Sequence, residues 1–370
     1  MEKDSERTLK ENKILKQKLE TISNENEALK KSLYDLSIKY NQLNKPASIF
    51  EPFNPTAKFN ISSDSIDIDD YIPSKSNLFN LRNDLKGHVG AVYVAKYSNC
   101  GKYIASGSFD TNIKIWDTGT FKELCTLKNH LLNVSDVCWI NSSSVLSGSF
   151  DQTVKSWSIE SSKMIDSFNV EGFVQTVDQF SNLYCFGTSR CVLGIIDPRA
   201  NTTVVIKNDS MVNSIICFGN NILSGDSNGN LKTWDTRTMT CVSTMQNENN
   251  AQITGISRVS NSPEETRYIS VNSYDNVVRV YELKEMRLVR ILKGMSSRNW
   301  PIRSSMYLNV EGDLMVGSGS SDGKVYLYLN EELKQRIQGH ADRVYGVSFS
   351  VNGDFCSCSS DCVVKVWKGQ

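Results

Sequence analysis

The chain has 370 residues, of which 39% are hydrophobic, so it can bury a large core. Its 41 basic and 41 acidic residues balance. This balance predicts no direct binding of nucleic acid, and a membrane only through partner proteins. The first residues are charged, and no apolar run approaches the ~20 residues of a membrane span. We therefore expect a soluble intracellular protein in the cytoplasm, with the nucleus as an alternative.

The first 45 residues carry apolar side chains at alternating steps of three and four. Such a 3.5-residue repeat predicts a parallel α-helical coiled coil over 1–45. The polar residues of its seam, Asn12 and Asn26, both fall at a positions, which favours a parallel pair. A homodimer is the favoured interpretation; a heteromeric coiled coil and a helix docked on its own domain stay open.

A segment rich in proline and aspartate follows over residues 46–77. This composition predicts a flexible linker. The acids in its second half alternate with Ile66, Ile68, Tyr71 and Ile72, so a docking peptide that adds a strand to a partner's sheet is the alternative.

From residue 78 to 370, strand and turn signals recur in seven units. The third strand of each unit ends in an aromatic or large apolar residue, at Trp116, Trp157, Ile196, Trp234, Tyr281, Tyr328 and Trp367. Six residues earlier lies a turn, occupied by Asp110, Asp151, Arg190, Asn228, Asp275, Asp322 and Asp361. The regular spacing predicts a repeat architecture built from small sheets.

These registered copies, together with Gly87-His88 and Trp116-Asp117, resemble the WD-repeat family of β-propellers. The resemblance implies an all-β, seven-bladed propeller over 78–370. A strand-two serine, Ser106 or Ser108 in the first unit, should join the motif residues in one network. The motif positions of three units are His88, Asp110 and Trp116, His130, Asp151 and Trp157, and His340, Asp361 and Trp367. We interpret this network as structural, since a buried polar group costs little only when it is paired.

The chain ends three residues after Trp367, so the last unit lacks its outermost strand. An unpaired edge would expose backbone donors and acceptors. The spare strand-like segment over 78–86 is therefore predicted to close the last blade and join the two ends of the domain.

The resemblance also implies a binding face, with exposed positions in the loop before strand one and at the turn of each blade. Aromatic residues and arginine gather there, and these residue types dominate protein interfaces. The predicted partner-binding positions are Tyr93, Phe109, Phe150, Phe173, Tyr274, Arg303, Arg343 and Tyr345. Packing of some of these rings into the loops is the alternative.

Two Asp-x-Arg sequences end consecutive third strands, and they contain Arg199 and Arg237. They are similar to the paired motif of propellers that dock on the cullin-4 ubiquitin-ligase adaptor. A local salt bridge is the alternative interpretation.

The sequence contains no phosphate-binding glycine loop, no nucleophile elbow and no cluster of metal ligands. The ten cysteines lack the spacing of a zinc site or a disulfide framework. We therefore expect no enzyme activity, metal or cofactor.

The order of coiled coil, linker and propeller resembles that of the Atg-family autophagy scaffold and that of the G-protein β subunit. The favoured function is a dimeric scaffold that binds proteins or peptides on its propeller. A ubiquitin-ligase substrate receptor and a G-protein-β-like signalling subunit are the alternatives.

Overall fold

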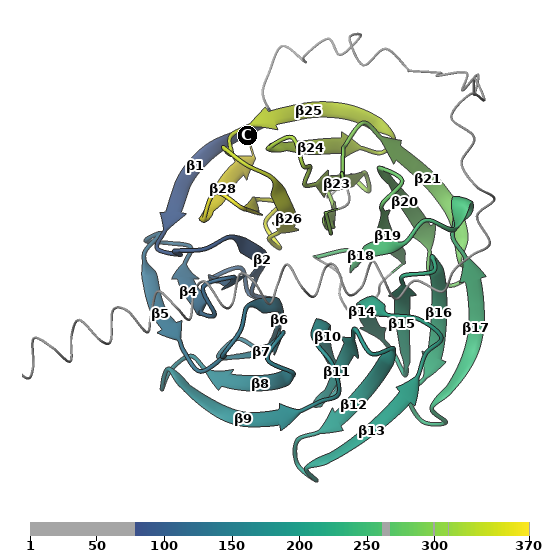
Figure 1. Cartoon of the computed structure of the whole chain (residues 1–370). Helices are drawn as coiled ribbons and strands as arrows, with labels where there is room; N and C mark the ends of the chain where they lie inside the picture. Colours follow the sequence, from purple (N-terminus) through teal and green to yellow (C-terminus); the bar gives the residue numbers. More distant parts are fainter. Residues whose placement is uncertain (1–77, 261–266, 299, 310, 370) are drawn as a thin grey trace, which may run out of the picture. The chain divides into compact units, whose positions relative to one another are not determined.

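The computed structural model describes residues 78–260, 267–298, 300–309 and 311–369. The coiled coil predicted over 1–45, with Asn12 and Asn26, and the linker predicted over 46–77 lie outside these residues. The described residues form seven four-stranded sheets, which Figure 1 shows as the blades of a ring. The all-β, seven-bladed propeller is confirmed.

The first four blades follow one another along the chain, each from its innermost to its outermost strand (Figure 1). Blade one comprises β2 (Val92–Tyr97), β3 (Tyr103–Ser108), β4 (Ile113–Asp117) and β5 (Glu123–Leu127). Blade two comprises β6 (Val134–Asn141), β7 (Ser144–Ser149), β8 (Thr153–Ser158) and β9 (Lys163–Asn169). Blade three comprises β10 (Val174–Phe180), β11 (Leu183–Thr188), β12 (Val192–Asp197) and β13 (Thr202–Lys207). Blade four comprises β14 (Val212–Phe218), β15 (Asn221–Asp226), β16 (Asn230–Asp235) and β17 (Thr240–Gln246).

The last three blades complete the ring. A short 3-10 helix, η2 (Glu248–Asn250), precedes blade five. Blade five comprises β18 (Ile253–Arg258), β19 (Tyr268–Ser273), β20 (Val277–Glu282) and β21 (Arg287–Lys293). Blade six comprises β22 (Ser304–Leu308), β23 (Leu314–Ser318), β24 (Lys324–Leu329) and β25 (Glu332–Gln338). Blade seven comprises β26 (Val344–Phe349), β27 (Phe355–Ser359), β28 (Val363–Gly369) and β1 (Phe79–Lys86).

The core lies between neighbouring blades, because each blade buries one face against the next. Val94 and Ile115 of blade one, for example, share a cluster with Val137 and Trp139 of blade two. Glycine in the second strand permits the close approach of two blades. A Cβ atom on Gly107 would lie 2.7 Å from the Cγ1 atom of Val134, the first residue of the next inner strand.

The outer strand of blade seven comes from the opposite end of the domain. β1 pairs with β28 from Phe79 opposite Gly369 to Lys86 opposite Val363. The Phe79 ring stacks edge-on against Phe355, with centroids 4.9 Å apart. The side-chain amide of Gln335, on β25, accepts from the Phe79 amide at 3.0 Å and donates to the Phe79 carbonyl at 3.1 Å. The first strand is therefore fixed to blades six and seven together.

Among the described residues, no helix is long and apolar enough to cross a membrane.

The inner strands are mostly buried, whereas outer strands such as β13 are mostly exposed.

Candidate functional site

A network of four side chains holds the loop before the inner strand of blade one. Asp110 accepts from the ring Nδ1 of His88 at 2.8 Å and from the Val89 amide at 3.0 Å. The hydroxyl of Ser106 lies 2.8 Å from the Nε2 atom of His88 and accepts from the Trp116 indole at 2.8 Å. Ser106, rather than Ser108, is thus the serine of the network. The four side chains bond one another and the loop backbone, so they tie the loop to the blade.

Blades two and seven repeat this geometry. His130 lies 2.8 Å from Asp151, and His340 lies 2.8 Å from Asp361. The indoles of Trp157 and Trp367 likewise donate to strand-two serines. Each of the three turn carboxylates also accepts from the backbone amide after the histidine.

The turn carboxylates of these blades stay ionised to low pH. Burial alone would raise the pKa of Asp110, but hydrogen bonds from His88, Val89 and Asn112 lower it to about 2. The pKa values of Asp151 and Asp361 also lie at about 2 for the same reason. Burial lowers the pKa of His130, so a neutral imidazole donates to an ionised carboxylate.

Blade four builds a related network from other residues. Asn228 occupies the turn, and the carboxylate comes instead from Asp226, two residues earlier. Asp226 accepts from Asn208 Nδ2 at 3.3 Å and from the Asn228 amide at 3.0 Å. Trp234 still donates to Ser224 at 2.8 Å. The acid and the histidine position have therefore both changed while the indole–serine bond is kept.

Blades five and six differ again. In blade five, Arg279 donates to Ser273 at 3.0 Å and to the turn residue Asp275 at 2.7 Å. In blade six, the Tyr326 hydroxyl donates to the turn residue Asp322 at 2.8 Å. The hydroxyl of Tyr328, at the tryptophan position, donates to the Lys293 carbonyl at 2.8 Å. Loss of the histidine therefore leaves the turn acids with a partner.

The structure brings four of the predicted aromatic residues together in two pairs at or next to these loops. Phe150 and Phe173, from neighbouring blades, stack with centroids 5.3 Å apart and an interplanar angle of 20°. Phe109 and Tyr274 are half-buried in their own turns. Tyr93 lies edge-on to Tyr345, with centroids 5.1 Å apart.

Tyr345 is a correction to the predicted set of exposed positions. Its ring is only 3% exposed, because it is packed between Tyr93 and Trp300. Its hydroxyl is bonded to Ser360 at 3.0 Å. The residue therefore supports the loop face from beneath and offers little contact area of its own.

Trp300 is a residue that the sequence did not place in the site. It lies in the irregular loop before β22, and Arg343 stacks over its ring at 4.0 Å. Both side chains are half-buried. The sequence offered one signal for this position: Trp300 is a large aromatic residue that no repeat motif requires. Arg343 and Trp300 thus form one cation–π pair on the loop face.

Arg303 is a second correction. It was predicted on the binding face, but its guanidinium turns into the central channel. There it donates to Asp136 of blade two at 2.9 Å and to the Gln175 carbonyl of blade three at 3.2 Å. Lys96 of blade one lies 2.9 Å from the same Asp136 oxygen. Arg303 therefore joins blade six to the far side of the ring.

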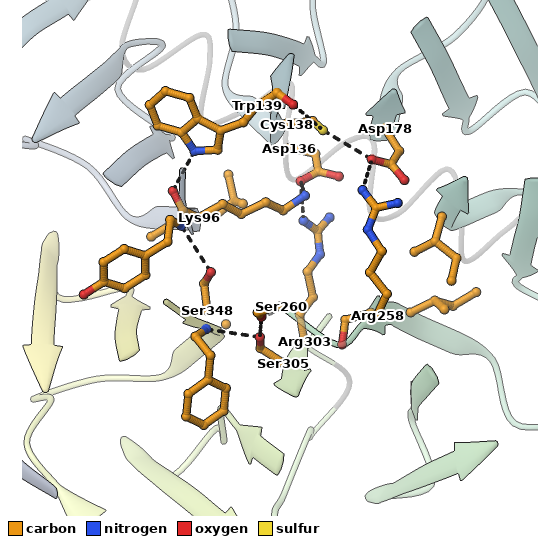
Figure 2. A pocket seen from close by; sticks show the side chains of 18 of the residues that line it. Lys96, Asp136, Cys138, Trp139, Asp178, Arg258, Ser260, Arg303, Ser305 and Ser348 are labelled. Atoms are coloured by element: carbon orange, nitrogen blue, oxygen red, sulfur yellow. Dashed lines mark hydrogen bonds and ion pairs between the residues drawn. The ribbon is translucent and has the colours of Figure 1, made fainter. Parts of the chain in front are cut away.

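Figure 2 shows this channel, with Arg303 and Lys96 pointing toward Asp136. A second pair lies beside the first: Arg258 of blade five donates to Asp178 of blade three at 3.4 Å and to the Cys217 carbonyl at 2.7 Å. The channel has a cavity of about 190 Å³, and residues of all seven inner strands line it.

The two Asp-x-Arg sequences lie at the ends of β12 and β16. The side chains of Arg199 and Arg237 are 70% and 74% exposed. Each lies near the aspartate of its own sequence, at 3.2 Å from Asp197 and 3.6 Å from Asp235. Both guanidiniums are thus accessible while they form local pairs. Within the residues described, no group of His, Cys, Asp and Glu could hold a metal ion.

Comparison with known proteins finds the family described as WD domain, G-beta repeat, in residues 79–117, 121–158 and 331–368. These are the segments that contain the three histidine networks. A WD repeat domain-containing protein 83 homolog of Dictyostelium discoideum is 24% identical over 322 residues, which cover 76% of this chain and 96% of that protein.

Two further relatives share the repeat region. Eukaryotic translation initiation factor 3 subunit I of Drosophila grimshawi is 26% identical over 313 residues, covering 76% of this chain and 94% of the relative. Protein tipD of Dictyostelium discoideum is 23% identical over 257 residues, covering 65% of this chain and 40% of the relative. None of the three names is that of an enzyme.

Proposed function

Because the chain is a seven-bladed propeller that carries WD repeats, we propose that it is a non-enzymatic scaffold. Proteins or peptides bind the loop face of the propeller, and the coiled coil of residues 1–45 joins two copies. The observation that carries the proposal is the pair of aromatic groups on the loop face, Phe150 with Phe173 and Trp300 with Arg343.

These groups have the properties of an interface. Aromatic side chains and arginine supply most of the energy of typical protein interfaces. Their rings are half-buried, so part of each ring is open to solvent. The neighbouring histidine networks fix the loops that carry them, so a partner would meet a surface that needs little reordering.

The loop-face proposal is tested by changing Phe150, Phe173 and Trp300 together to Ala, which removes both aromatic groups. We expect loss of the main partners in affinity purification with quantitative mass spectrometry, which would also identify those partners. The matched control changes Ile165, Val205 and Val242 to Ala, since these exposed apolar residues lie on outer strands. If the loop-face variant kept every partner of the wild-type chain, binding at this face would be rejected.

Self-association is supported by the two asparagines of the predicted seam, because two asparagines at a positions can bond each other in a parallel pair. Light scattering on the full chain and on residues 78–370 tests it. We expect twice the monomer mass for the full chain and one monomer mass for the propeller. A monomeric full chain that associates with a separate helical protein would favour a G-protein-β-like subunit instead.

A second candidate function is a substrate receptor of a cullin-4 type ubiquitin ligase. The exposure of Arg199 and Arg237 on consecutive blades supports it. Reversing both charges to Glu should abolish recovery of the ligase adaptor while leaving loop-face partners bound. Recovery of equal adaptor by the variant and the wild type would remove this candidate. For either function we propose a cytoplasmic location, tested by imaging the tagged full chain.

A further inference from the structure

The central channel carries more positive than negative charge. Three cations line it, Lys96, Arg258 and Arg303, against two carboxylates, Asp136 and Asp178. The difference, three minus two, is one positive charge. The lysine side chain is 36% exposed and the two arginine side chains are 27% and 20% exposed. A partly desolvated excess charge is unfavourable unless a counter-charge pairs with it.

Neither carboxylate has the capacity to neutralise this excess. Asp136 accepts from Lys96 and Arg303 on one oxygen, and from the Thr176 hydroxyl and the Val177 amide on the other. Burial alone would raise the pKa of Asp136, but the charges of Arg303 and Lys96 lower it. The acid is therefore already fully ionised and fully used.

Asp178 is used in the same way. It accepts from Arg258 at 3.4 Å, from the Cys138 thiol at 3.2 Å and from the Cys217 amide at 2.7 Å. The other polar side chains that line the channel are uncharged, such as amides, hydroxyls and a thiol, so none of them can neutralise the excess.

The serine hydroxyls of the channel are arranged as donors. Ser348 accepts from the Tyr97 amide at 3.2 Å, Ser305 from the Phe349 amide at 3.2 Å, and Ser214 from the Ile256 amide at 2.9 Å. A serine that accepts from a backbone amide still has its own O–H to donate. Ser305 and Ser260 lie 3.2 Å apart and bond each other, so this pair uses one of its two O–H groups internally and keeps the other. Figure 2 shows Ser305 and Ser260 on the side of the cavity away from Asp136, and Ser348 beside the strand that carries Lys96.

An ammonium group with three N–H donors, of which Asp136 takes one, thus lines the same cavity as several hydroxyl donors. Donors and excess positive charge together suit an anion. The cavity of about 190 Å³ is smaller than the roughly 300–1,000 Å³ of sites for drug-sized ligands. We propose that the central channel binds one small tetrahedral oxyanion, such as inorganic phosphate, between Lys96 and the serines of blades six and seven.

The anion would link blades that no direct side-chain pair of the channel joins. Lys96 belongs to blade one, and Ser305 belongs to blade six. Since an anion that binds only the closed ring stabilises it, its binding should raise the melting temperature of the propeller. This site is separate from the loop face, so neither proposal depends on the other.

The test is calorimetric titration of the full chain with sodium phosphate near neutral pH, at an ionic strength held constant with potassium chloride. We expect saturable binding at one site, competition by sulfate, and no competition by chloride. Lys96→Met should weaken phosphate binding by about tenfold or more, because a charge-assisted contact is lost. Lys102→Met is the matched control, since Lys102 is exposed on the same blade outside the channel.

Two results would overturn the proposal: phosphate binding that is not saturable, or unchanged affinity in the Lys96→Met protein. If that variant does not melt cooperatively, Ser348→Ala decides, because it removes only a hydroxyl group. A loss of phosphate affinity of about threefold or more in Ser348→Ala supports the site, and wild-type affinity in Ser348→Ala rejects it.

Discussion

Blade one and blade four hold the same loop with different side chains. In blade one, Asp110 accepts from a histidine and from the loop amide of Val89. In blade four, Asp226 accepts from Asn208 and from the amide of Asn228 within its own turn. The carboxylate and the indole–serine bond are common to both. These two blades therefore both keep a satisfied carboxylate at this turn, and a histidine in one and an asparagine in the other satisfy it.

The difference has a consequence for rigidity. In blades one, two and seven the carboxylate joins two loops, because it accepts from the amide after the histidine and from the turn. In blade six, Asp322 accepts from its own turn amide of Lys324 and from Tyr326. We therefore expect the histidine blades to form the more rigid half of the ring, which surrounds the strand that closes it.

The largest effect should come from removing that strand. A chain that begins at Gly87 loses seven residue pairs between β1 and β28 and the stacking of Phe79 on Phe355. The edge of blade seven is then unpaired, and we expect no cooperative thermal unfolding. A chain that begins at Leu78 is the control and should melt as the full propeller does. If both chains melted cooperatively at one temperature, the rigid half would not depend on ring closure.

The next effect concerns a bond between the two halves. Asp136 belongs to blade two and pairs with Arg303 of blade six in a buried position. Asp136→Asn removes the counter-charge of two cations, and breaking such a buried pair costs about 3–5 kcal/mol. Chemical denaturation should measure this loss in the free energy of unfolding. Glu171→Gln is the control with a small expected effect, because the Glu171 side chain is 67% exposed and pairs with Arg190 at the surface; equal losses would contradict a role for the channel pair.

Two single substitutions compare a turn acid that bonds a histidine with one that does not. Asp151→Asn in blade two disturbs bonds from His130, the Leu131 amide and Thr153. Asp322→Asn in blade six disturbs two bonds within one turn. Because hydrogen bonds to charged groups are worth about 1.5–3 kcal/mol, we expect a loss of roughly 3 kcal/mol for the first and about half of that for the second. Equal losses would show that the histidine adds nothing to the turn.

The smallest effect should appear on acidification. The pKa values of Asp110, Asp151 and Asp361 lie at about 2 in the fold, below the ordinary value of 3.8. The unfolded chain therefore binds protons more readily, so the stability that these groups supply is complete above about pH 4 and is lost as the pH falls toward 2. Hydrogen exchange of the Val89, Leu131 and Ala341 amides should rise over this interval. Unchanged protection of these amides at pH 2 would contradict the assignment.

The repeat was readable from the sequence because local patterns encode it. Trp116 lies near the end of a strand that is buried almost throughout, and the residues of its network lie within one blade, so their spacing is fixed by the strands themselves. The spare segment before Gly87 was readable too, since a three-stranded last blade has an open edge. The structure pairs that segment with β28.

The two corrections have a different origin. Arg303 has the register of a face residue, but its direction depends on Asp136, which is 167 residues away and meets it only after the ring closes. Tyr345 has the same register and is covered by Trp300 from a loop that follows no repeat pattern. Asp226 replaces the turn acid from two residues away, a compensation that no single motif position reveals. Contacts across the ring, and the replacement of a motif residue by one at another position, could therefore not be predicted from the repeat pattern.

The pairing of Phe79 with Gly369 has a mechanical consequence. In an antiparallel pair whose outer strand starts where the inner strand ends, tension between the two ends of the domain acts on one hydrogen-bonded pair at a time. The strands would separate in the unzipping geometry, one hydrogen-bonded pair after another, and not in the shear geometry, in which all pairs bear the load together. The two bonds from Gln335 and the Phe79–Phe355 stack lie at the end where unzipping would begin. A load carried by the N-terminal segment would thus be resisted first by the contacts of Phe79 with Gln335 of blade six and Phe355 of blade seven.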